Sequence, residues 1–440
     1  MIPRFGTDGW RGRAYDELTV DFVRLLGEVS ATVLGGDTFL VGRDTRASGA
    51  DLEQAFADGL ARQDVRAKSL HVTPTPAVAW LSAADGIAAA MISASHNPYY
   101  DNGIKLFAPG GAKLSDVTQN RIQAELDRRG ATPAPAAAAT IIDCRDELAR
   151  YRRAVIDSLE GRDLRGLRLV IDCANGSNYE IAPAVLAAVG AEVEVIHDAP
   201  DGHNINDHCG STHPEDLQRL VVEHEADIGL AFDGDADRVL AVDHRGQLID
   251  GDHIIAICAI DRHARGALVR NAVAVTVMSN LGFRLSMQAR GIEVIETPVG
   301  DRYVLEALER EGATFGGEQS GHIIFSDLAT TGDGLLTAVQ LLDVVSRSGR
   351  PLADLSAESM TRLPQVLRNV RVPAPVADLA ARIGPAVARI EATLAGRGRV
   401  LIRPSGTEPL VRVMVEAPSQ HEAAAFAEEL AEVVTALATE

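Results

Sequence analysis

Residues 39–49, Phe-Leu-Val-Gly-Arg-Asp-Thr-Arg-Ala-Ser-Gly, pass from an apolar run rich in β-formers into a polar loop that contains glycine, and a helical pattern follows. The same succession recurs where residues 169–171 precede Asp-Cys-Ala-Asn-Gly-Ser-Asn and where residues 273–277 precede Met-Ser-Asn-Leu-Gly. Alternation of strand, loop and helix predicts mixed or parallel sheets covered by helices. Because the succession recurs at intervals of roughly one hundred residues, an ordinary domain size, we expect three related α/β domains.

The chain divides further at changes of composition. Its 440 residues suggest roughly two to four domains. The Ala/Pro segment 131–140 is one candidate boundary, although the helical-looking stretch 147–159 could itself be the joint; others lie near residues 250 and 363. The remainder has the pattern of a strand, a helix, two short strands around a loop and a terminal Ala/Glu helix, typical of a small α+β domain. We predict four domains, at residues 1–149, 150–250, 251–363 and 364–440.

Composition and charge exclude several classes of protein. Hydrophobic residues make up 46% and charged residues 24% of the chain, as in a globular protein, and no apolar run approaches the ~20 residues of a membrane-spanning helix. Met1–Arg4 leads directly into a Gly-rich polar stretch, so we expect no signal peptide. The four cysteines form no CxxC pair, which favours a reducing cytoplasm over a zinc site or a disulfide framework. The net charge of −20 opposes nucleic-acid binding.

The first loop whose residues are suited to catalysis is Ser93-Ala94-Ser95-His96-Asn97-Pro98, which we call the Ser95 loop. Pro98 and the later Gly103 are typical of a loop, and Asn97 is kept out of helical geometry by the proline. A serine beside a histidine suggests a nucleophile, but neighbours in an extended loop point to different sides, so His96 need not activate Ser95. The simpler interpretation is an Asn-Pro turn with a capping serine.

The second is Asp233-Gly-Asp235-Ala-Asp237-Arg238, the aspartate loop, which follows the apolar run 228–232. Carboxylates at alternate positions after a strand can converge on one hard cation. An EF-hand is excluded, because its sixth and twelfth positions would need Gly and Glu, where this chain has Arg238 and His244. Three carboxylate ligands leave positions for water or a phosphate oxygen, which suits Mg²⁺ in phosphoryl transfer. The alternative is a charged turn held by Arg238.

Two more loops carry groups suited to sugar phosphates. Residues 316–322, Gly-Gly-Glu-Gln-Ser-Gly-His, let hydrogen-bonding side chains approach a polyhydroxylated ligand closely; a plain turn is the alternative. Residues 403–409, Arg-Pro-Ser-Gly-Thr-Glu-Pro, with Arg412 beyond, combine cations, hydroxyls and a glycine as a phosphate cradle would, or form a hairpin turn. We call them the sugar loop and the phosphate loop. The Gly-rich stretch 6–12 lacks GxGxxG and a leading strand, so a dinucleotide fold is not indicated.

In this order, the four loops resemble those of the α-D-phosphohexomutase family over nearly the whole chain: SASHNP its phosphoserine loop, DGDADR its metal loop, GEQSGH its sugar loop and RPSGTEP its phosphate loop. The longer stretches FGTDGWRG, GRDTRASG, ISASHNPYYDNGIKLF, DCANGSNYEIAP, NINDHCGSTHPE, GEQSGHII, TTGDG and SGTEPLVRVMVE are most similar to members that act on glucosamine phosphates. The resemblance implies three related mixed-sheet α/β domains and a C-terminal α+β domain of the TATA-binding-protein-like kind around a central cleft. Trp10, beside Arg11, departs from the smaller aliphatic residue usual in the family, and Ala236 is a frequent variant of its glycine.

The resemblance also implies a reaction. Phosphorylated Ser95 would give its phosphoryl group to a sugar phosphate, and the 1,6-bisphosphate, here glucosamine 1,6-bisphosphate, would turn over and return its other phosphate. Mg²⁺ would be the cofactor, and for Arg11 we favour an electrostatic role over that of a base because its pKa is above ~12. The residues implied are Ser95, Arg11, Lys105 and Arg238 in catalysis; Glu318, Ser320, His322, Arg403, Ser405, Gly406, Thr407 and Arg412 in substrate binding; and Asp233, Asp235 and Asp237, with Ser95, at the metal.

Three alternatives stay open at this point. Within the family, the substrate could be a glucose or mannose phosphate. An aspartyl-phosphate phosphatase would use Asp233-x-Asp235 as its nucleophile motif, but it leaves the other three loops unexplained. A non-catalytic sugar-phosphate sensor would need no phosphoryl carrier, so the serine together with all three aspartates disfavours it. We expect a small-molecule sugar phosphate as partner, no nucleic acid and no membrane; a homodimer stays open, since the sequence does not show the oligomeric state.

Overall fold

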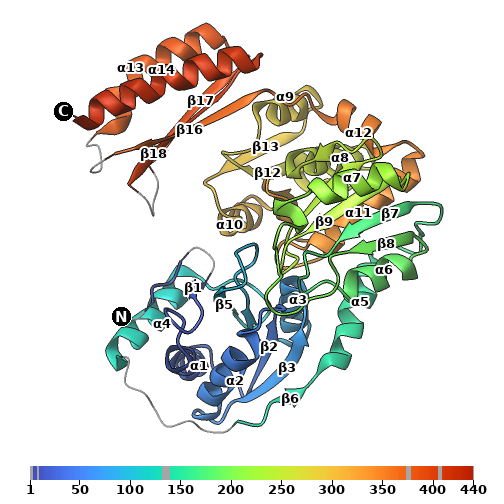
Figure 1. The fold of residues 1–440 in the computed structure, drawn as a ribbon, viewed down its shortest axis with the longest axis vertical. Helices are drawn as coiled ribbons and strands as arrows, with labels where there is room; N and C mark the ends of the chain where they lie inside the picture. The colour runs from blue at the N-terminus through green and yellow to red at the C-terminus, as the bar shows by residue number, and fades with distance from the viewer. Residues whose placement is uncertain (1–2, 7–8, 131–138, 373–377, 405–408, 440) are drawn as a thin grey trace. The chain divides into compact units, whose positions relative to one another are not determined.

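The computed structural model describes residues 3–6, 9–130, 139–372, 378–404 and 409–439 (Figure 1). By their contacts they form two compact units: Met1–Met278 with Gly291–Ser359, and Ser279–Arg290 with Met360–Glu440. Among the described helices, none is both long enough and apolar enough to span a membrane. Each unit is described by itself below.

The first sheet is mixed and has six strands in the order β1-β5-β4-β2-β3-β6. β2 runs parallel to β3 and β4, whereas β5 runs antiparallel to β4 and β1. Because β2 and β4 are parallel neighbours, the loops that follow them leave the same edge of the sheet, and the second of these is the Ser95 loop. The bounds are β1 Trp10–Arg13, β2 Thr38–Arg43, β3 Arg66–Val72, β4 Ala88–Ile92, β5 Asp101–Phe107, β6 Ile142–Asp143, α1 Val20–Leu34, α2 Gly49–Ala61, α3 Thr75–Asp85 and α4 Asp116–Arg129.

Helices α1 and α2 pack with their backbones almost in contact (Figure 1). A Cβ atom on Gly27 would lie 2.2 Å from the carbonyl oxygen of Phe56, and one on Gly59 would lie 2.0 Å from that of Arg24. Glycine at both positions is therefore required by the close approach and not by an unusual backbone angle. Helix α1 begins at a Thr19 cap whose side chain accepts from the backbone N–H of Phe22.

Trp10 lies fully buried in the core of the first sheet. Its ring packs edge-on against Phe5 at 4.6 Å, and its Nε1 donates to Gln123 Oε1 at 3.3 Å. Since neighbours on a strand point to opposite faces, Arg11 faces away from this core, and it lines the cavity described below. The large side chain at position 10 is therefore accommodated without covering the neighbouring cation.

The second sheet has the order β11-β10-β9-β7-β8. β9 is buried at every residue and runs parallel to β7 and antiparallel to β10. The aspartate loop joins β9 to β10, so a strand with no exposed face fixes where that loop begins. The bounds are β7 Arg168–Asp172, β8 Glu192–Ile196, β9 Ile228–Phe232, β10 Val239–Asp243, β11 Leu248–Ile249, α5 Leu148–Asp157, α6 Ile181–Ala188 and α7 Glu215–Glu223, with short 3₁₀ turns at Arg145–Glu147 and Gly210–Thr212.

The third sheet has the order β13-β12-β14-β15, with β14 and β15 antiparallel. These two strands enclose residues 318–322 of the sugar loop. The bounds are β12 Ala272–Thr276, β13 Glu293–Thr297, β14 Phe315–Gly317, β15 Ile323–Phe325, α8 Gly251–Ala264, α10 Asp301–Glu311, α11 Gly334–Ser348 and α12 Leu352–Ser359, with a 3₁₀ turn at Val269–Asn271.

The second unit is an antiparallel sheet, β16-β18-β17, packed with two long helices. Helix α9 joins it through Glu416, which is fully buried and accepts from the backbone N–H of Leu281 at 2.8 Å and from Arg399 Nε at 2.7 Å. The fold class is confirmed: three mixed α/β sheets precede an α+β region. The bounds are α9 Leu281–Ala289, β16 Gln365–Arg371, α13 Leu379–Leu394, β17 Arg399–Pro404, β18 Leu410–Glu416 and α14 Gln420–Thr439.

Candidate active site

The structure brings the Ser95 loop and the aspartate loop together, although they are far apart in sequence. Ser95 is 1% exposed and its Oγ donates to Asp233 Oδ2 at 2.6 Å. Its φ of 53° lies in the left-handed region, which a residue with a side chain adopts only when its surroundings hold it there. The serine hydroxyl is therefore fixed against a carboxylate from a different sheet.

The three aspartates converge on one point. Asp233, Asp235 and Asp237 are buried, and one oxygen of each lies within 4.8 Å of the others. Oδ1 of Asp235 and Oδ1 of Asp237 accept no hydrogen bond from any residue that the structure describes. Burial, then Asp237 and Asp235, raise the pKa of Asp233 well above its ordinary value. Unsatisfied oxygens and crowded negative charge are what a hard divalent cation would relieve, so the residues fit such an ion.

Lys105 supplies the positive charge nearest to these carboxylates. It extends from β5, is 4% exposed, and its Nζ donates to Asp235 Oδ2 at 2.8 Å and to Asp237 Oδ2 at 3.2 Å. Thr75 Oγ1 donates to the same oxygen of Asp235 at 2.6 Å. Burial opposes the charge of Asp237, but Lys105, His322 and Arg238 hold its pKa well below its ordinary value. These neighbours therefore favour the charged form of Asp237.

His96 and Arg238 face each other beside the serine. Arg238 Nη1 lies 3.3 Å from His96 Nδ1, and Ser95 Oγ lies 3.4 Å from the same nitrogen. Burial, then Arg238 and Arg11, lower the pKa of His96 to about 4. The imidazole is thus neutral near pH 7 and adds no charge to the site. Arg238 also donates through its backbone N–H to Asp233 Oδ1 at 3.2 Å.

A cavity of about 440 Å³ opens in front of these groups. Glu318 of the sugar loop lines it and accepts from the backbone N–H of Gly300 at 3.0 Å. His322 also lines it, with Nδ1 3.5 Å from Asp237 Oδ1 and Nε2 3.2 Å from Asp301 Oδ2. Ser320 is exposed and is not among the lining residues that the structure describes. The lining residues are Arg4, Gly6, Gly9, Arg11, His96, Asp237, Arg238, Val299, Gly300, Asp301, Glu318 and His322.

The predicted phosphate loop belongs to the second unit. Arg403 on β17 lies directly opposite Arg412 on β18, and burial, then Arg412, lower the pKa of Arg403. Like charges opposite each other in an antiparallel pair are unfavourable unless an anion joins them. Ser405, Gly406 and Thr407 lie outside the described residues.

Sequence reasoning missed two polar neighbours of the site. Thr75 bonds Asp235 through both its hydroxyl and its backbone N–H. Asp301 at the start of α10 pairs with His322 and with Lys113 of the first sheet's domain. For Asp301 a signal was available, because Gly-Asp-Arg at 300–302 lies between a strand and a helix and is typical of a functional turn. For Thr75, which lies between two prolines, the sequence gives no signal of a role at the site.

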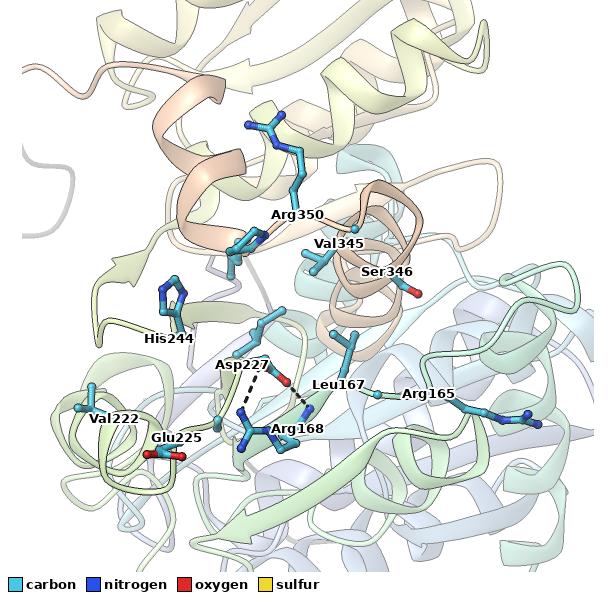
Figure 2. A pocket seen from close by; sticks show the side chains of 16 residues that line it. Arg165, Leu167, Arg168, Val222, Glu225, Asp227, His244, Val345, Ser346 and Arg350 are labelled. Atoms are coloured by element: carbon cyan, nitrogen blue, oxygen red, sulfur yellow. Dashed lines mark hydrogen bonds and ion pairs between the residues drawn. The ribbon is translucent and has the colours of Figure 1, made fainter.

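A second pocket, larger than the cavity in front of the Ser95 and aspartate loops, lies elsewhere in the first unit. Its volume is about 610 Å³, and its lining includes Arg165, Arg168, Glu225, Asp227 and His244 (Figure 2). Arg168 is paired with Asp227, whose Oδ2 accepts from its backbone N–H at 2.8 Å (Figure 2). Three arginines and two acidic residues line this pocket, and it contains none of the residues of the four predicted loops.

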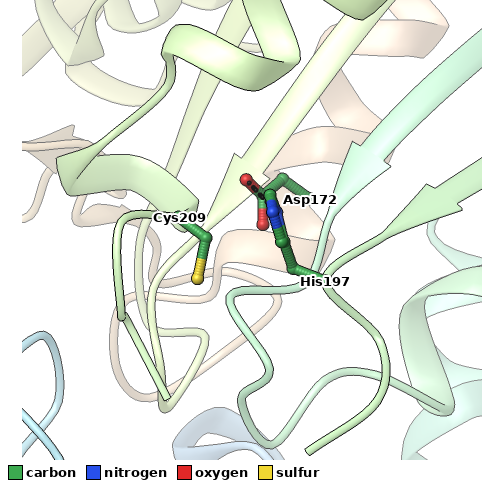
Figure 3. Close-up of side chains that lie close together, drawn as sticks. All are labelled: Asp172, His197 and Cys209. Atoms are coloured by element: carbon green, nitrogen blue, oxygen red, sulfur yellow. Dashed lines mark ion pairs between the residues drawn. The ribbon is translucent and has the colours of Figure 1, made fainter. Parts of the chain in front are cut away.

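A second group with metal-ligand chemistry is Asp172, His197 and Cys209 (Figure 3). His197 Nδ1 lies 3.0 Å from Asp172 Oδ2, and the two carboxylate oxygens also accept from the backbone N–H groups of Ala174 and Gly210, both at 2.8 Å. Burial, then Asp172, raise the pKa of Cys209 to about 12, so its sulfur stays a thiol. The group ties two loops together through Asp172.

Comparison with known proteins places the chain among sugar-phosphate mutases. Four family models match, described as Phosphoglucomutase/phosphomannomutase alpha/beta/alpha domain I at residues 3–132, domain II at 149–246, domain III at 250–363 and the C-terminal domain at 367–433. A phosphoglucosamine mutase of Desulforudis audaxviator is 49% identical over 440 residues, covering 98% of this chain and 97% of that protein. One of Desulforamulus reducens is 48% identical over 452 residues, covering 99% of both chains.

Solved structures share the fold. A phosphoglucomutase/phosphomannomutase family protein of Burkholderia thailandensis matches with a TM-score of 0.81 and 25% identity over 99% of this chain and 98% of that one. The N-acetylphosphoglucosamine mutase of Aspergillus fumigatus, in complex with GlcNAc-6P and magnesium, matches with a TM-score of 0.68 and 19% identity over 100% of this chain and 96% of that one.

Proposed function

Because the chain belongs to the phosphoglucomutase/phosphomannomutase family, we propose that it interconverts glucosamine 6-phosphate and glucosamine 1-phosphate. It is an isomerase, a phosphohexomutase that moves a phosphoryl group between two oxygens of one sugar. Glucosamine is chosen over glucose and mannose because the full-length relatives at 46–50% identity are phosphoglucosamine mutases.

One observation carries the proposed chemistry: Ser95 Oγ lies 2.6 Å from Asp233 within a buried group of three carboxylates. A serine phosphorylated at this oxygen would place its phosphate beside the two carboxylate oxygens that have no hydrogen-bond partner among the described residues. Mg²⁺, held by Asp233, Asp235, Asp237 and a phosphate oxygen on Ser95, would offset charge on the transferring group.

We assign the protein's own groups as follows. The bond from Ser95 Oγ to phosphorus breaks as the sugar hydroxyl attacks, the hydroxyl proton leaves the attacking oxygen, and Ser95 Oγ becomes a hydroxyl again. The hydroxyl proton thus replaces the phosphoryl group on Ser95 Oγ, and Lys105, hydrogen-bonded to two of the aspartates, is proposed as the electrostatic or proton-relay partner of the attacking oxygen, giving up one of its own protons for each that it takes. Arg11 and Arg238 line the cavity and act electrostatically, since a guanidinium keeps its proton.

Substrate recognition is proposed for the remaining loops. Glu318 and His322 line the cavity, where sugar hydroxyls would be bound. Ser320 is kept as a proposed contact from the resemblance alone. We propose that the phosphate that is not reacting is held by Arg403, Ser405, Gly406, Thr407 and Arg412.

Glucosamine 1,6-bisphosphate would be both intermediate and activator. All four cysteines are free, which suits a reducing cytoplasm. The net charge of −20 disfavours a nucleic-acid partner, and a homodimer stays a prediction. The domain boundaries at 149, 250 and 363 likewise stay a prediction.

The decisive experiment combines intact mass with turnover. We expect the isolated protein to carry one phosphate that survives acid, lost in Ser95→Ala together with nearly all turnover, and retained in the control Ser346→Ala, at an exposed serine of α11. Rates on glucosamine, glucose and mannose phosphates, each with a catalytic amount of the matching 1,6-bisphosphate, should be highest for glucosamine. An acid-labile phosphate on Asp233 would establish a phosphatase instead, and binding of sugar phosphate without turnover would establish a sensor.

A further inference from the structure

A buried guanidinium lies behind the Ser95 loop and uses all of its donors. The Arg46 side chain is 0% exposed. Its Nε donates to Asp44 Oδ2 at 2.8 Å, and its Nη2 donates to the carbonyl oxygens of Ser95 at 3.0 Å and Asn97 at 2.8 Å. Its Nη1 donates to the carbonyl oxygens of Pro98 and, at 3.0 Å, of Asp101. An arginine side chain has five N–H donors, and each one is engaged here.

Asn206 approaches the same carbonyl groups from the second domain. Its Nδ2 donates to the carbonyl oxygen of Ser95 at 2.9 Å and to that of Asn97 at 3.1 Å. The Ser95 carbonyl therefore accepts from two side chains that lie 160 positions apart in the sequence, as their numbers show. Among the described contacts, these donors bind Asp44 and carbonyl oxygens of the Ser95 loop and its continuation, and none binds Asp233, Asp235 or Asp237. Any effect of Arg46 and Asn206 on the chemistry would therefore pass through the loop.

The backbone N–H of Ser95 is held as well. It donates to Ser93 Oγ at 2.9 Å, and Ser93 Oγ donates to Asp44 Oδ2 at 2.6 Å, the oxygen that also accepts from Arg46. Both backbone groups of Ser95 are thus tied to one buried network. This explains how Ser95 keeps its left-handed φ of 53° although it has a side chain.

We infer that Arg46 and Asn206 are positioning residues for phosphoryl transfer, which hold the Ser95 backbone so that Oγ faces Asp233. The inference rests on the proposed role of Ser95 as phosphoryl carrier. The planar guanidinium can bind four carbonyl oxygens spread over seven residues of chain, whereas an ammonium, with three donors around one nitrogen, cannot. Arg46→Lys therefore keeps the charge and loses the geometry.

The test is a single-turnover measurement on the intact protein. Each variant is first phosphorylated with glucose 1,6-bisphosphate, its Ser95 occupancy is read by intact mass, and the rate constant for transfer to glucosamine 6-phosphate is measured by rapid quench. A merely structural role lowers the amplitude, because fewer molecules are folded, but leaves the rate constant unchanged. Misplacement of a reacting group by about 1 Å costs roughly 100-fold in rate, so we expect about that loss for Arg46→Lys.

Two variants complete the design. Asn206→Asp keeps the shape and the tolerance of a left-handed backbone but replaces the donor by an acceptor, and we expect a loss of roughly tenfold in the rate constant. Arg43→Lys is the matched control: it makes the same change three residues away, where the guanidinium pairs with Glu53 at 2.9 Å, and we expect its rate constant to be that of the unaltered protein.

The outcomes separate this inference from the proposed function. Normal rate constants in Arg46→Lys and Asn206→Asp, with only lower amplitudes or melting temperatures, would overturn the inference and leave the mutase intact. If Arg46→Lys does not fold, a normal rate constant in Asn206→Asp would by itself overturn the inference. Failure of the unaltered protein to take phosphate on Ser95 would remove the proposed function and this inference with it.

Discussion

Gly234 lies where the aspartate loop meets both the Ser95 loop and Asn206, and there is no room for a larger residue. A Cβ atom at this position would lie 2.7 Å from the Ser95 carbonyl oxygen and 2.7 Å from Asn206 Nδ2. Ordinary contact begins at 3.4 Å, so in Gly234→Ala the Ser95 carbonyl has to retreat by the difference, about 0.7 Å. Since a displacement of roughly 1 Å at a reacting group costs about 100-fold, we expect kcat to fall by about 10- to 100-fold.

The assay is steady-state turnover of glucosamine 6-phosphate in the presence of a catalytic amount of the 1,6-bisphosphate. Because the alanine disturbs the phosphoryl carrier and not the cavity wall that meets the sugar, KM should change little while kcat falls. A thermal melt of each preparation, with Ser95 occupancy by intact mass, separates this effect from loss of folded protein.

The aspartate loop offers its own control at Ala236. This residue is buried and has a φ of 59°, a conformation that favours glycine. Ala236→Gly should therefore keep kcat and gain stability of up to about 1 kcal/mol, since left-handed geometry costs a residue with a Cβ about that much.

A folded Gly234→Ala protein with kcat within about twofold of normal would show that the Ser95 loop is not held against Gly234, and the reasoning from close contact would fail.

Three further predictions follow from the site. Asp235→Asn should lower kcat far more than it raises KM, because the metal ligand acts on charge in the transition state; full activity at ordinary Mg²⁺ would remove this loop from the mechanism. Arg403→Ala should raise KM by about 10- to 100-fold in both directions and release free bisphosphate, as loss of a charge-assisted phosphate contact would; a defect in one direction without release would mean separate anchors. Burial raises the pKa of Asp333 from 3.8 to about 6, so its ionisation destabilises the fold as pH rises from about 4 to 6. Asp333→Asn should gain up to about 3 kcal/mol relative to the normal protein over that range in denaturant unfolding, and a pH-independent difference would contradict this.

Much of the fold could be predicted because its signals are local. Apolar runs such as 228–232 predict buried strands, and the polar loops that follow them predict the edge of the sheet where candidate site residues lie. The approach of Ser95 to Asp233 follows the same logic, since each residue comes just after a strand that is buried throughout. Where the strands are short and fully buried, the sequence leaves little freedom for the loops between them.

What could not be predicted depends on contacts between distant segments. Helix α9 follows a strand of the third sheet in sequence, yet it packs with the second unit because the buried carboxylate of Glu416, 135 positions away, caps its backbone. No local pattern marks Glu416, which looks like an ordinary polar residue at a strand end. Thr75 is a similar case, because its hydrogen bond to Asp235 depends on how two sheets pack together. The sequence around Thr75, a threonine between two prolines, does not indicate that packing.

The charges at the site explain how an acidic protein can hold an anionic substrate. With all three aspartates ionised the cluster would carry three negative charges, and Lys105 and Arg238 return two positive ones, which leaves a net charge of −1. A divalent cation would reverse that sign, and a phosphate on Ser95 with a charge between about −1.5 and −2 would bring it back near its starting value. The phosphate alone would take the cluster to a net charge between about −2.5 and −3, whereas with the cation also bound the net charge stays between about −0.5 and −1. The neutral His96, whose pKa is about 4, leaves this balance undisturbed. The cation and the phosphoserine would therefore each favour binding of the other, and the site would be poised for charge to shift to the sugar phosphate and back.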